Sequence, residues 1–281
     1  MLRSTKSINT RKTQTLFNIP KPILTMIKFS IENQIARLTF NNDKKRNSLS
    51  FEMLEDIYEA LDQIDDSVRV LVIRANKGSK VWSAGFNIDE LPLPGQDPLP
   101  FNHPLETLLR KLQNVSCPII AQIEGSVWGG ACELALTCDI LIGTPKTTFA
   151  ITPAKIGVPY NTSGIMRVMN SVSINIAKEM FFTAQPVKAE RAHQLGIMNH
   201  LVEVDELEDF VNEMANSICA NSPLSIRVIK EQIQVISKSH PISINDSERI
   251  DQVRTDAYHS QDYLEGKKAF EERRKPVFIG K

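Results

Sequence analysis

The first patterned segment of the chain alternates apolar and polar residues. Ile27, Phe29 and Ile31 alternate with polar neighbours, and a second largely apolar run extends from Ile35 to Phe40. Alternation with a period of two is typical of β-strands that have one buried face. The polar residues 32–34 lie between the two runs, so the pattern predicts a β-hairpin.

The pattern then changes to a helical period. Apolar residues recur at intervals of three and four, which places them on one face of a helix that begins after Ser50 as N-cap. The apolar positions are Leu54, Ile57, Tyr58, Leu61 and Ile64, and the acidic positions predicted for the opposite face are Glu52, Glu55, Asp56, Asp62 and Asp65.

Short apolar runs rich in β-branched residues predict buried strands farther along the chain. These runs cover residues 68–75, 118–123, 138–143 and 147–150. The rest is predominantly helical by its periodicity. Helices are expected over residues 163–170, 174–183, 188–195, 223–236, 247–258 and 261–274, and a further helix is expected to begin after Asp205 and end at residue 220. A proline-rich segment from Leu91 to Pro104 predicts a long loop, either a lid over a site or a surface excursion.

The composition is that of a globular protein. The chain has 281 residues, 42% of them hydrophobic, which is enough for a sizeable core in one domain. Lys plus Arg and Asp plus Glu number 33 each, so the charge balance gives no reason to expect nucleic acid or a membrane surface as a partner. The four cysteines and five histidines form no metal-binding motif, and we expect reduced thiols and no metal.

Residues 1–25 differ from the rest because they contain five basic residues and no acidic one. This bias fits an organellar transit peptide, a disordered tail or a start assigned too early, since Met26 opens the patterned sequence. We expect a cytoplasmic protein, or one of the mitochondrial matrix if these residues are a transit peptide.

Two glycine-bearing segments follow predicted strands. Residues 80–88 read KVWSAGFNI, and residues 124–136 read EGSVWGGACELAL, with a helix expected after Gly130. Glycine lets another molecule approach the backbone, and a helix start carries free N–H groups with a partial positive charge. Two such turns that converge would suit an oxygen that becomes negatively charged. The alternative for each is a tight connection with no ligand.

These two segments resemble the crotonase (enoyl-CoA hydratase/isomerase) superfamily, whose members carry S-A-G-x-D-x and, about forty residues later, G-x-x-x-G-G-x-x-E-L. The resemblance implies an α/β fold, a spiral of repeated β-β-α units over residues 26–200, and a C-terminal helical region over 201–281 that covers the site and forms trimers. It also implies an acyl-coenzyme A substrate, bound without a separate cofactor, and a homotrimer or hexamer.

The resemblance assigns roles to individual residues. The amides of Phe86 and Gly130 match the pair that stabilises an enolate oxygen. Coenzyme A would lie along the SAGFNI segment, and Arg273 is our candidate for its phosphates. The coenzyme A contacts so expected come from Ala84, Gly85, Phe86, Asn87, Ile88, Gly130, Thr152 and Arg273.

The same resemblance argues against water addition. Hydratases of the family use two carboxylates, and Glu133 matches the first, but Ala154 occupies the position of the second. Without the second carboxylate, acid–base catalysis loses about two to four orders of magnitude. Residues 78–85, 125–131, 152–161 and 275–278 are instead similar to family members that decarboxylate methylmalonyl-CoA, which implies decarboxylation of methylmalonyl-CoA or a close malonyl-CoA homologue.

Thr152 and Tyr160 are the candidates for turning the substrate carboxylate out of the thioester plane. Trp128, Ile156 and Val158 are expected to form an apolar wall that excludes water from it. Phe86 stands where those decarboxylases have His. Each of these residues also has an interpretation without a ligand. Glu133 could stabilise the start of its helix, and Tyr160 could be an ordinary loop aromatic. Trp82 and Trp128 could be core residues. The alternative functions are an enoyl-CoA hydratase or isomerase acting through Glu133, and a non-catalytic binding protein of the same fold.

Overall fold

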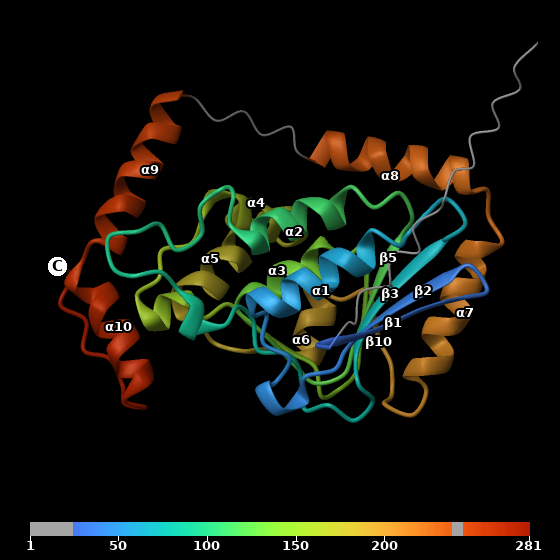
Figure 1. Cartoon of the computed structure of the whole chain (residues 1–281), viewed down its shortest axis with the longest axis horizontal. Helices are drawn as coiled ribbons and strands as arrows, with labels where there is room; N and C mark the ends of the chain where they lie inside the picture. The colour runs from blue at the N-terminus through green and yellow to red at the C-terminus, as the bar shows by residue number, and fades with distance from the viewer. Residues whose placement is uncertain (1–24, 238–243) are drawn as a thin grey trace, which may run out of the picture.

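A computed structural model describes residues 25–237 and 244–281 (Figure 1). The predicted leader therefore lies almost entirely outside the described residues. The folded part begins at Thr25 and Met26, whose amides both donate to the Asp56 carboxylate at 2.8 and 2.7 Å. Asp56 is buried by this contact, so the sequence prediction that it faces solvent was wrong.

A six-stranded sheet forms the centre of the molecule. Its order is β1-β2-β3-β5-β7-β10; β1 and β2 are antiparallel, and the following neighbours are parallel. The strands are β1 (Ile27–Glu32), β2 (Ile35–Phe40), β3 (Val70–Ala75), β5 (Ile119–Ile123), β7 (Ile140–Gly143) and β10 (His200–Leu201). The predicted hairpin and the three predicted strands among these are confirmed. Buried parallel strands read as continuous apolar runs, which is why the sequence located them.

A second, smaller sheet has the order β4-β6-β8-β9. Its strands are β4 (Val81–Ser83), β6 (Ser126–Trp128), β8 (Thr148–Ala150) and β9 (Val187–Lys188). Strands β4 and β6 carry the two glycine turns, and they pair in parallel. This pairing brings together two turns that are about forty residues apart in the sequence.

Helices cover both faces of the large sheet. On one face α1 (Phe51–Leu61), α2 (Pro104–Gln113) and α3 (Gly130–Thr137) enclose the main core, as Figure 1 shows. On the other face α7 (Leu207–Cys219) packs through Leu207, Val211 and Ala215 against apolar side chains of the strands. Helix α2 was not predicted, although its leucines recur at helical spacing, because the proline-rich segment before it dominates the pattern.

The remaining helices surround these layers. They are α4 (Thr162–Ser171), α5 (Ile174–Thr183), α6 (Ala189–Gln194), α8 (Pro223–Ser237), α9 (Ile244–Tyr258) and α10 (Gln261–Glu271). Short 3-10 turns are η1 (Asp43–Lys45), η2 (Ile88–Glu90) and η3 (Pro153–Ile156). Helices α9 and α10 lie at the opposite end of the molecule from α7 (Figure 1). No helix in the described ranges is long and apolar enough to cross a bilayer.

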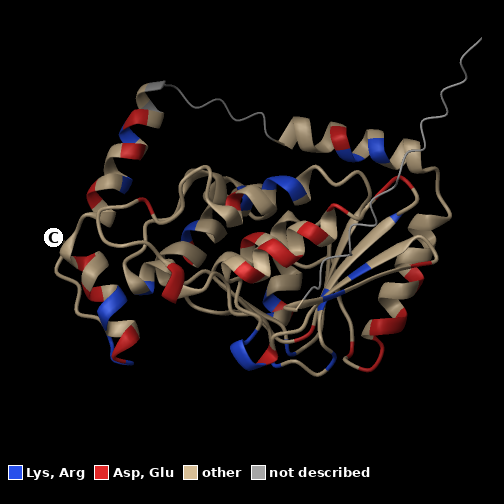
Figure 2. Cartoon of the chain, in the orientation of Figure 1, with Lys and Arg blue, Asp and Glu red and all other residues tan. Residues whose placement is uncertain are grey.

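Acidic and basic residues are interspersed along the described part of the chain (Figure 2). This distribution agrees with the equal numbers of basic and acidic residues in the sequence. In particular, no single stretch of the drawn ribbon is uniformly basic.

Candidate active site

The first glycine turn presents the amide of Phe86. Leu49 forms an isolated parallel bridge to Phe86, in which the Leu49 amide donates to Gly85 O at 2.8 Å and Leu49 O accepts from the Asn87 amide at 3.2 Å. In a parallel bridge the flanking residues make both bonds, so the N–H of Phe86 itself points away from Leu49. Within the described residues this N–H donates to no protein acceptor.

The second turn presents the amide of Gly130. Gly129 has φ +51° and donates its own N–H to Ala150 O at 2.8 Å, which fixes the turn between β6 and α3. Helix α3 then begins at Gly130. The first N–H groups of a helix have no partner inside it, and they form the positive end of its dipole.

The two amides lie close together because Gly85 has no side chain. Gly85 has φ +83°, and a Cβ added there would overlap the carbonyl oxygen of Trp128 and lie 3.1 Å from the Gly130 nitrogen. A Cβ added at Gly130 would lie 3.6 Å from the Phe86 nitrogen. The turns are therefore in direct contact, and both free amides open toward the same space, as an oxyanion hole requires.

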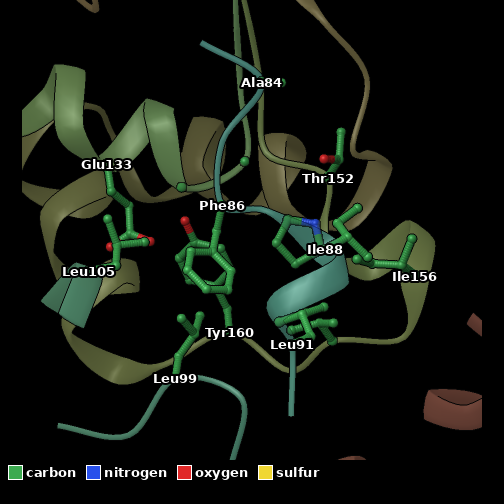
Figure 3. A pocket seen from close by; sticks show the side chains of 14 residues that line it. Ala84, Phe86, Ile88, Leu91, Leu99, Leu105, Glu133, Thr152, Ile156 and Tyr160 are labelled. Atoms are coloured by element: carbon green, nitrogen blue, oxygen red, sulfur yellow. The ribbon is translucent and has the colours of Figure 1, made fainter. Parts of the chain in front are cut away.

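A cavity adjoins these amides (Figure 3). Its lining is mostly apolar, and among the described lining residues Glu133 is the only carboxylate, with no Lys or Arg. The lining residues are Ala84, Phe86, Ile88, Leu91, Leu99, Leu105, Gly129, Gly130, Glu133, Thr152, Pro153, Ile156, Val158 and Tyr160. In the part of the chain that is described, no three His, Cys, Asp or Glu residues are placed to hold a metal ion.

Glu133 is 1% exposed and projects from the first turn of α3. Arg167 on α4 donates to one of its oxygens at 2.7 Å. Burial raises the pKa of Glu133 to about 7, because removing a carboxylate from water disfavours its charged form; the positive charge of Arg167 opposes this shift without cancelling it. Glu133 is thus an acid that changes its charge near neutral pH.

Two hydroxyls, those of Thr152 and Tyr160, complete the polar lining. The Tyr160 hydroxyl is buried and has no hydrogen-bond partner. Burial and then the charge of Glu133 raise its pKa well above the usual range, so it stays a neutral donor. The Glu133 carboxylate lies near enough to this hydroxyl for the two groups to influence each other's charge state. Figure 3 shows Thr152 on the opposite side of the cavity from Glu133.

The other predicted site residues divide into two groups. Ala84 and Ile88 line the cavity, as expected of residues beside the ligand. The Asn87 side chain instead accepts from the Asp89 amide at 3.3 Å and donates to Glu90 at 3.0 Å, so it is used to cap η2. Arg273 follows the end of α10, is exposed, and does not line the cavity.

The predicted apolar wall is correct in part. Ile156 and Val158 line the cavity, but Trp128 does not: its indole N–H donates to Ser126 Oγ at 2.8 Å, away from the site. Trp82 is a core residue, fully buried and bonded to Gln122 O at 2.9 Å. Ala154 is exposed on η3 and contributes nothing to the cavity.

The feature behind the cavity was missed from the sequence, whereas the loop above it was predicted as either a lid or a surface excursion. Behind Glu133, Arg167 also binds Glu106 of α2, at 2.8 and 3.1 Å. Above it, the proline-rich loop contributes Leu91 and Leu99 to the lining. No sequence motif links these residues to Glu133, since they lie far away along the chain; only the spacing of leucines after Pro104 could have indicated a buried helix here.

The C-terminal helices hold this loop over the cavity. On α10 the Tyr263 hydroxyl donates to Pro92 O at 3.3 Å and the Lys267 ammonium to Leu91 O at 3.2 Å. Arg254 of α9 forms an ion pair with Asp97 at 2.6 Å. Helix α10 also packs on η3, where a Cβ at Gly266 would overlap the Ile156 carbonyl. The loop and η3, which form two walls of the cavity, are therefore both fastened to α10.

Comparisons with known proteins agree with this geometry. The family model "Enoyl-CoA hydratase/isomerase" matches residues 30–281. Methylmalonyl-CoA decarboxylase of Escherichia coli K12 is 44% identical over 249 residues, which are 88% of this chain and 95% of that protein. A short-chain-enoyl-CoA hydratase of Clostridium acetobutylicum is 31% identical over 72% of this chain and 78% of its own.

A solved structure of methylmalonyl-CoA decarboxylase in complex with 2-nitronate-propionyl-CoA superimposes with a TM-score of 0.90 at 43% identity. The match covers 92% of this chain and 99% of the other. The predicted α/β fold is confirmed by this agreement. From the matched motifs, the paired glycine turns and these relatives, the chain belongs to the crotonase superfamily, the enoyl-CoA hydratase/isomerase family.

Proposed function

We propose that this protein decarboxylates methylmalonyl-CoA, or a close malonyl-CoA homologue, to the corresponding acyl-CoA. The observation that carries the proposal is the cavity itself, which has two converging backbone amides, one carboxylate and no cation among its described lining residues. The 44% identity with an enzyme named for this reaction supports the same conclusion.

In the proposed reaction the thioester oxygen accepts hydrogen bonds from the amides of Phe86 and Gly130. The bond between the α-carbon and the carboxylate breaks, carbon dioxide leaves, and the electron pair moves into the thioester to form an enolate. The negative charge on the enolate oxygen faces two N–H groups and the positive end of α3. Removal of one such donor typically costs roughly 3 to 4 kcal/mol of transition-state stabilisation.

The polar residues of the cavity orient the substrate carboxylate. The bond that breaks has to stand perpendicular to the thioester plane, so that its electrons enter the carbonyl system. Thr152 and Tyr160 each have a hydroxyl that makes no hydrogen bond to a described residue, and we assign them to hold the carboxylate in this position. The unpaired Tyr160 hydroxyl supports the assignment, because a buried polar group without a partner is destabilising until a ligand supplies one.

The apolar walls favour loss of carbon dioxide. In this cavity the apolar side chains of Ile88, Ile156 and Val158 replace the water around the substrate carboxylate. No lining Lys or Arg stabilises its charge. The charge spreads over the larger enolate in the transition state, where the oxyanion hole receives it. Glu133 in its protonated form adds no second negative charge beside the substrate.

Coenzyme A is part of the substrate, and we propose that it extends from the cavity past Ala84 and Ile88. Arg273 is our candidate for its phosphates. Its neighbour Arg274 pairs with Glu265 and Glu272, whereas Arg273 forms no ion pair among the described residues. A free, exposed guanidinium can bind phosphate in a bidentate manner.

An enoyl-CoA hydratase is the second candidate, supported by the relative at 31% identity. It would need another carboxylate in the cavity beside Glu133, and Ala154 does not provide one. The test is to offer the purified protein methylmalonyl-CoA, ethylmalonyl-CoA and crotonyl-CoA and to follow carbon dioxide and thioester products. We expect carbon dioxide from a malonyl substrate; rapid hydration of crotonyl-CoA without carbon dioxide would overturn the proposal.

We propose further that the chain assembles as a homotrimer or a hexamer, with α8 at the interface. Three polar side chains of α8 face inward: Arg227 pairs with Asp66, Lys230 binds Asp139 at 2.7 Å, and Gln234 binds Gln113 O. The opposite face exposes Val228, Ile229, Ile233 and Ile236, between 52 and 72%. A helix that points its apolar face outward is typical of a surface covered by another subunit.

A further inference from the structure

The Glu133 carboxylate belongs to a buried cluster in which three helices each supply a charged side chain. Arg167 comes from α4, Glu106 from α2 and Glu133 from α3, and none of the three is more than 8% exposed. Two carboxylates thus share one guanidinium in a region buried from solvent. A cluster of this kind is costly to bury unless its charges balance.

The two carboxylates are not bound equally. Glu106 accepts a forked pair of hydrogen bonds from Arg167 at 2.8 and 3.1 Å, a third from the Asn161 amide at 2.7 Å and a fourth from the Ser163 hydroxyl at 3.0 Å. Glu133 accepts a single bond from the same guanidinium, at 2.7 Å. Four donors aimed at Glu106 favour its ionised form, so the proton that balances the cluster resides on Glu133.

The charge states agree with this geometry. Burial opposes ionisation of Glu106, but its bonds to Arg167, Asn161 and Ser163 outweigh it and lower the Glu106 pKa. For Glu133 burial dominates and raises the pKa to about 7. The titratable and charged groups facing Glu133 are Arg167 from α4, Glu106 from α2, Tyr160 from the loop before α4 and, on its own helix, the adjacent Cys132.

Glu133 also has the right position for an acid. It lies three residues after Gly130, just under one turn farther along the same helix. It lines the cavity, whereas Arg167 and Glu106 do not. Figure 3 shows its side chain extending to the cavity wall beside Leu105.

We propose that Glu106 is a positioning residue: it holds the Arg167 guanidinium and neutralises its charge, so that Glu133 stays protonated at the cavity wall and protonates the α-carbon of the enolate. After carbon dioxide leaves, the electron pair of the enolate takes the proton of Glu133 and forms the new C–H bond. The Glu133 carboxylate left behind pairs with Arg167, and it regains a proton from water when the product leaves. The inference rests on the proposed decarboxylation.

The experiment separates proton transfer from carbon–carbon cleavage. Carbon dioxide release from methylmalonyl-CoA tests the proposed function. The inference is tested by the reverse of its own step: the rate at which the protein exchanges the α-protons of propionyl-CoA for deuterium in heavy water, measured from pH 5 to 9. In this direction ionised Glu133 is the base, so the exchange rate is expected to rise with pH through a midpoint near 7.

Three variants distinguish the roles. Glu133→Gln is expected to lower the exchange rate at least 100-fold, while carbon dioxide release falls much less, because water can still protonate the enolate. Glu106→Gln removes the competing negative charge, so Arg167 favours ionised Glu133 and the midpoint is expected to move about one unit lower. Glu179→Gln is the matched control, because Glu179 forms the same forked pair with Arg191 on the surface, with both bonds at 2.8 Å; its midpoint is expected to stay unchanged.

Melting temperatures show whether each variant folds. A purely structural role for the cluster predicts that Glu106→Gln lowers stability and rate but leaves the midpoint where it is, and this result would overturn the inference. So would unchanged exchange in Glu133→Gln, or a wild-type protein that releases carbon dioxide but exchanges propionyl-CoA no faster than buffer. Absence of carbon dioxide release would refute the proposed function instead.

Discussion

Gly85 packs directly against the Trp128 carbonyl, and this contact sets the distance between the two turns of the candidate oxyanion hole. A Cβ at Gly85 would overlap that oxygen and crowd the Gly130 nitrogen at 3.1 Å. Gly85 therefore has two separate constraints, a φ of +83° and a neighbour with no room to move. The second constraint is the one that links this residue to activity.

Gly85→Ala is expected to reduce the decarboxylation rate by roughly 100-fold or more, because moving the Phe86 amide removes one oxyanion donor. The measurement is kcat with methylmalonyl-CoA. Gly78→Ala is the matched control: Gly78 has φ +82° but open space around its Cβ position. Both variants carry the backbone strain of about 1 kcal/mol, and equal activity in the two would contradict our account of the turn.

Tyr160→Phe is expected to lower kcat/KM at least tenfold while leaving the melting temperature unchanged or slightly higher. The hydroxyl has no protein partner, so its loss removes a buried unsatisfied group and no hydrogen bond. Tyr58→Phe on the outer side of α1, where the ring is 38% exposed, is the control and is expected to behave as wild type. Full activity in Tyr160→Phe would remove this hydroxyl from the mechanism.

Stability is expected to fall as the pH rises from about 5 to about 8. The folded state raises the pKa of Glu133 from 4.5 to about 7, so in this window the native protein binds a proton that the unfolded chain has lost. Stabilisation by the bound proton is complete below the unfolded pKa and disappears as the pH passes the folded one.

Denaturant unfolding of the wild type and of Glu133→Gln at several pH values measures this effect. The difference in unfolding free energy between the two is expected to change by a few kcal/mol at most, at about 1.4 kcal/mol per pKa unit. The pKa of Glu106 is lowered in the folded state, so its contribution to stability has the opposite pH dependence. That contribution is present at neutral pH and is lost as the pH falls into the acid range. A difference that is constant with pH would mean that Glu133 has an ordinary pKa.

The double variant Ile229→Asp and Ile233→Asp is expected to give a monomer. These side chains are 54 and 62% exposed on the outward face of α8, and a charge there could not be buried against a second subunit without a large penalty. Light scattering after gel filtration measures the mass. Ile31→Asp, on an exposed position of β1, is the control; the same mass for all three proteins would place the interface elsewhere.

Local patterns predicted the elements that depend on local physics. The hairpin before residue 40, helix α1 with its Ser50 cap, and the buried strand β5 follow from periodicity and capping. Strands β4, β6 and β9 have only two or three residues each, and they exist through pairing with distant segments that no local pattern encodes.

The same distinction applies to the site. The two glycine turns were recognisable because each follows a strand and has a fixed spacing to its helix or neighbour. The hydrogen bonds between Arg167 and Glu106 join residues that are 61 positions apart, and nothing in the sequence of either segment indicates that it contacts the other. Trp128 was expected in the cavity from its place in the motif, but strand alternation turns it away from the site.

The most direct test of the account is a crystal structure of this protein with a stable analogue of the thioester enolate, such as a nitronate of propionyl-CoA. The distances to be measured join the analogue oxygen to the main-chain nitrogens of Phe86 and Gly130. We predict that both lie between about 2.7 and 3.1 Å. An oxygen bound to only one of them, or held elsewhere in the cavity, would contradict the mechanism.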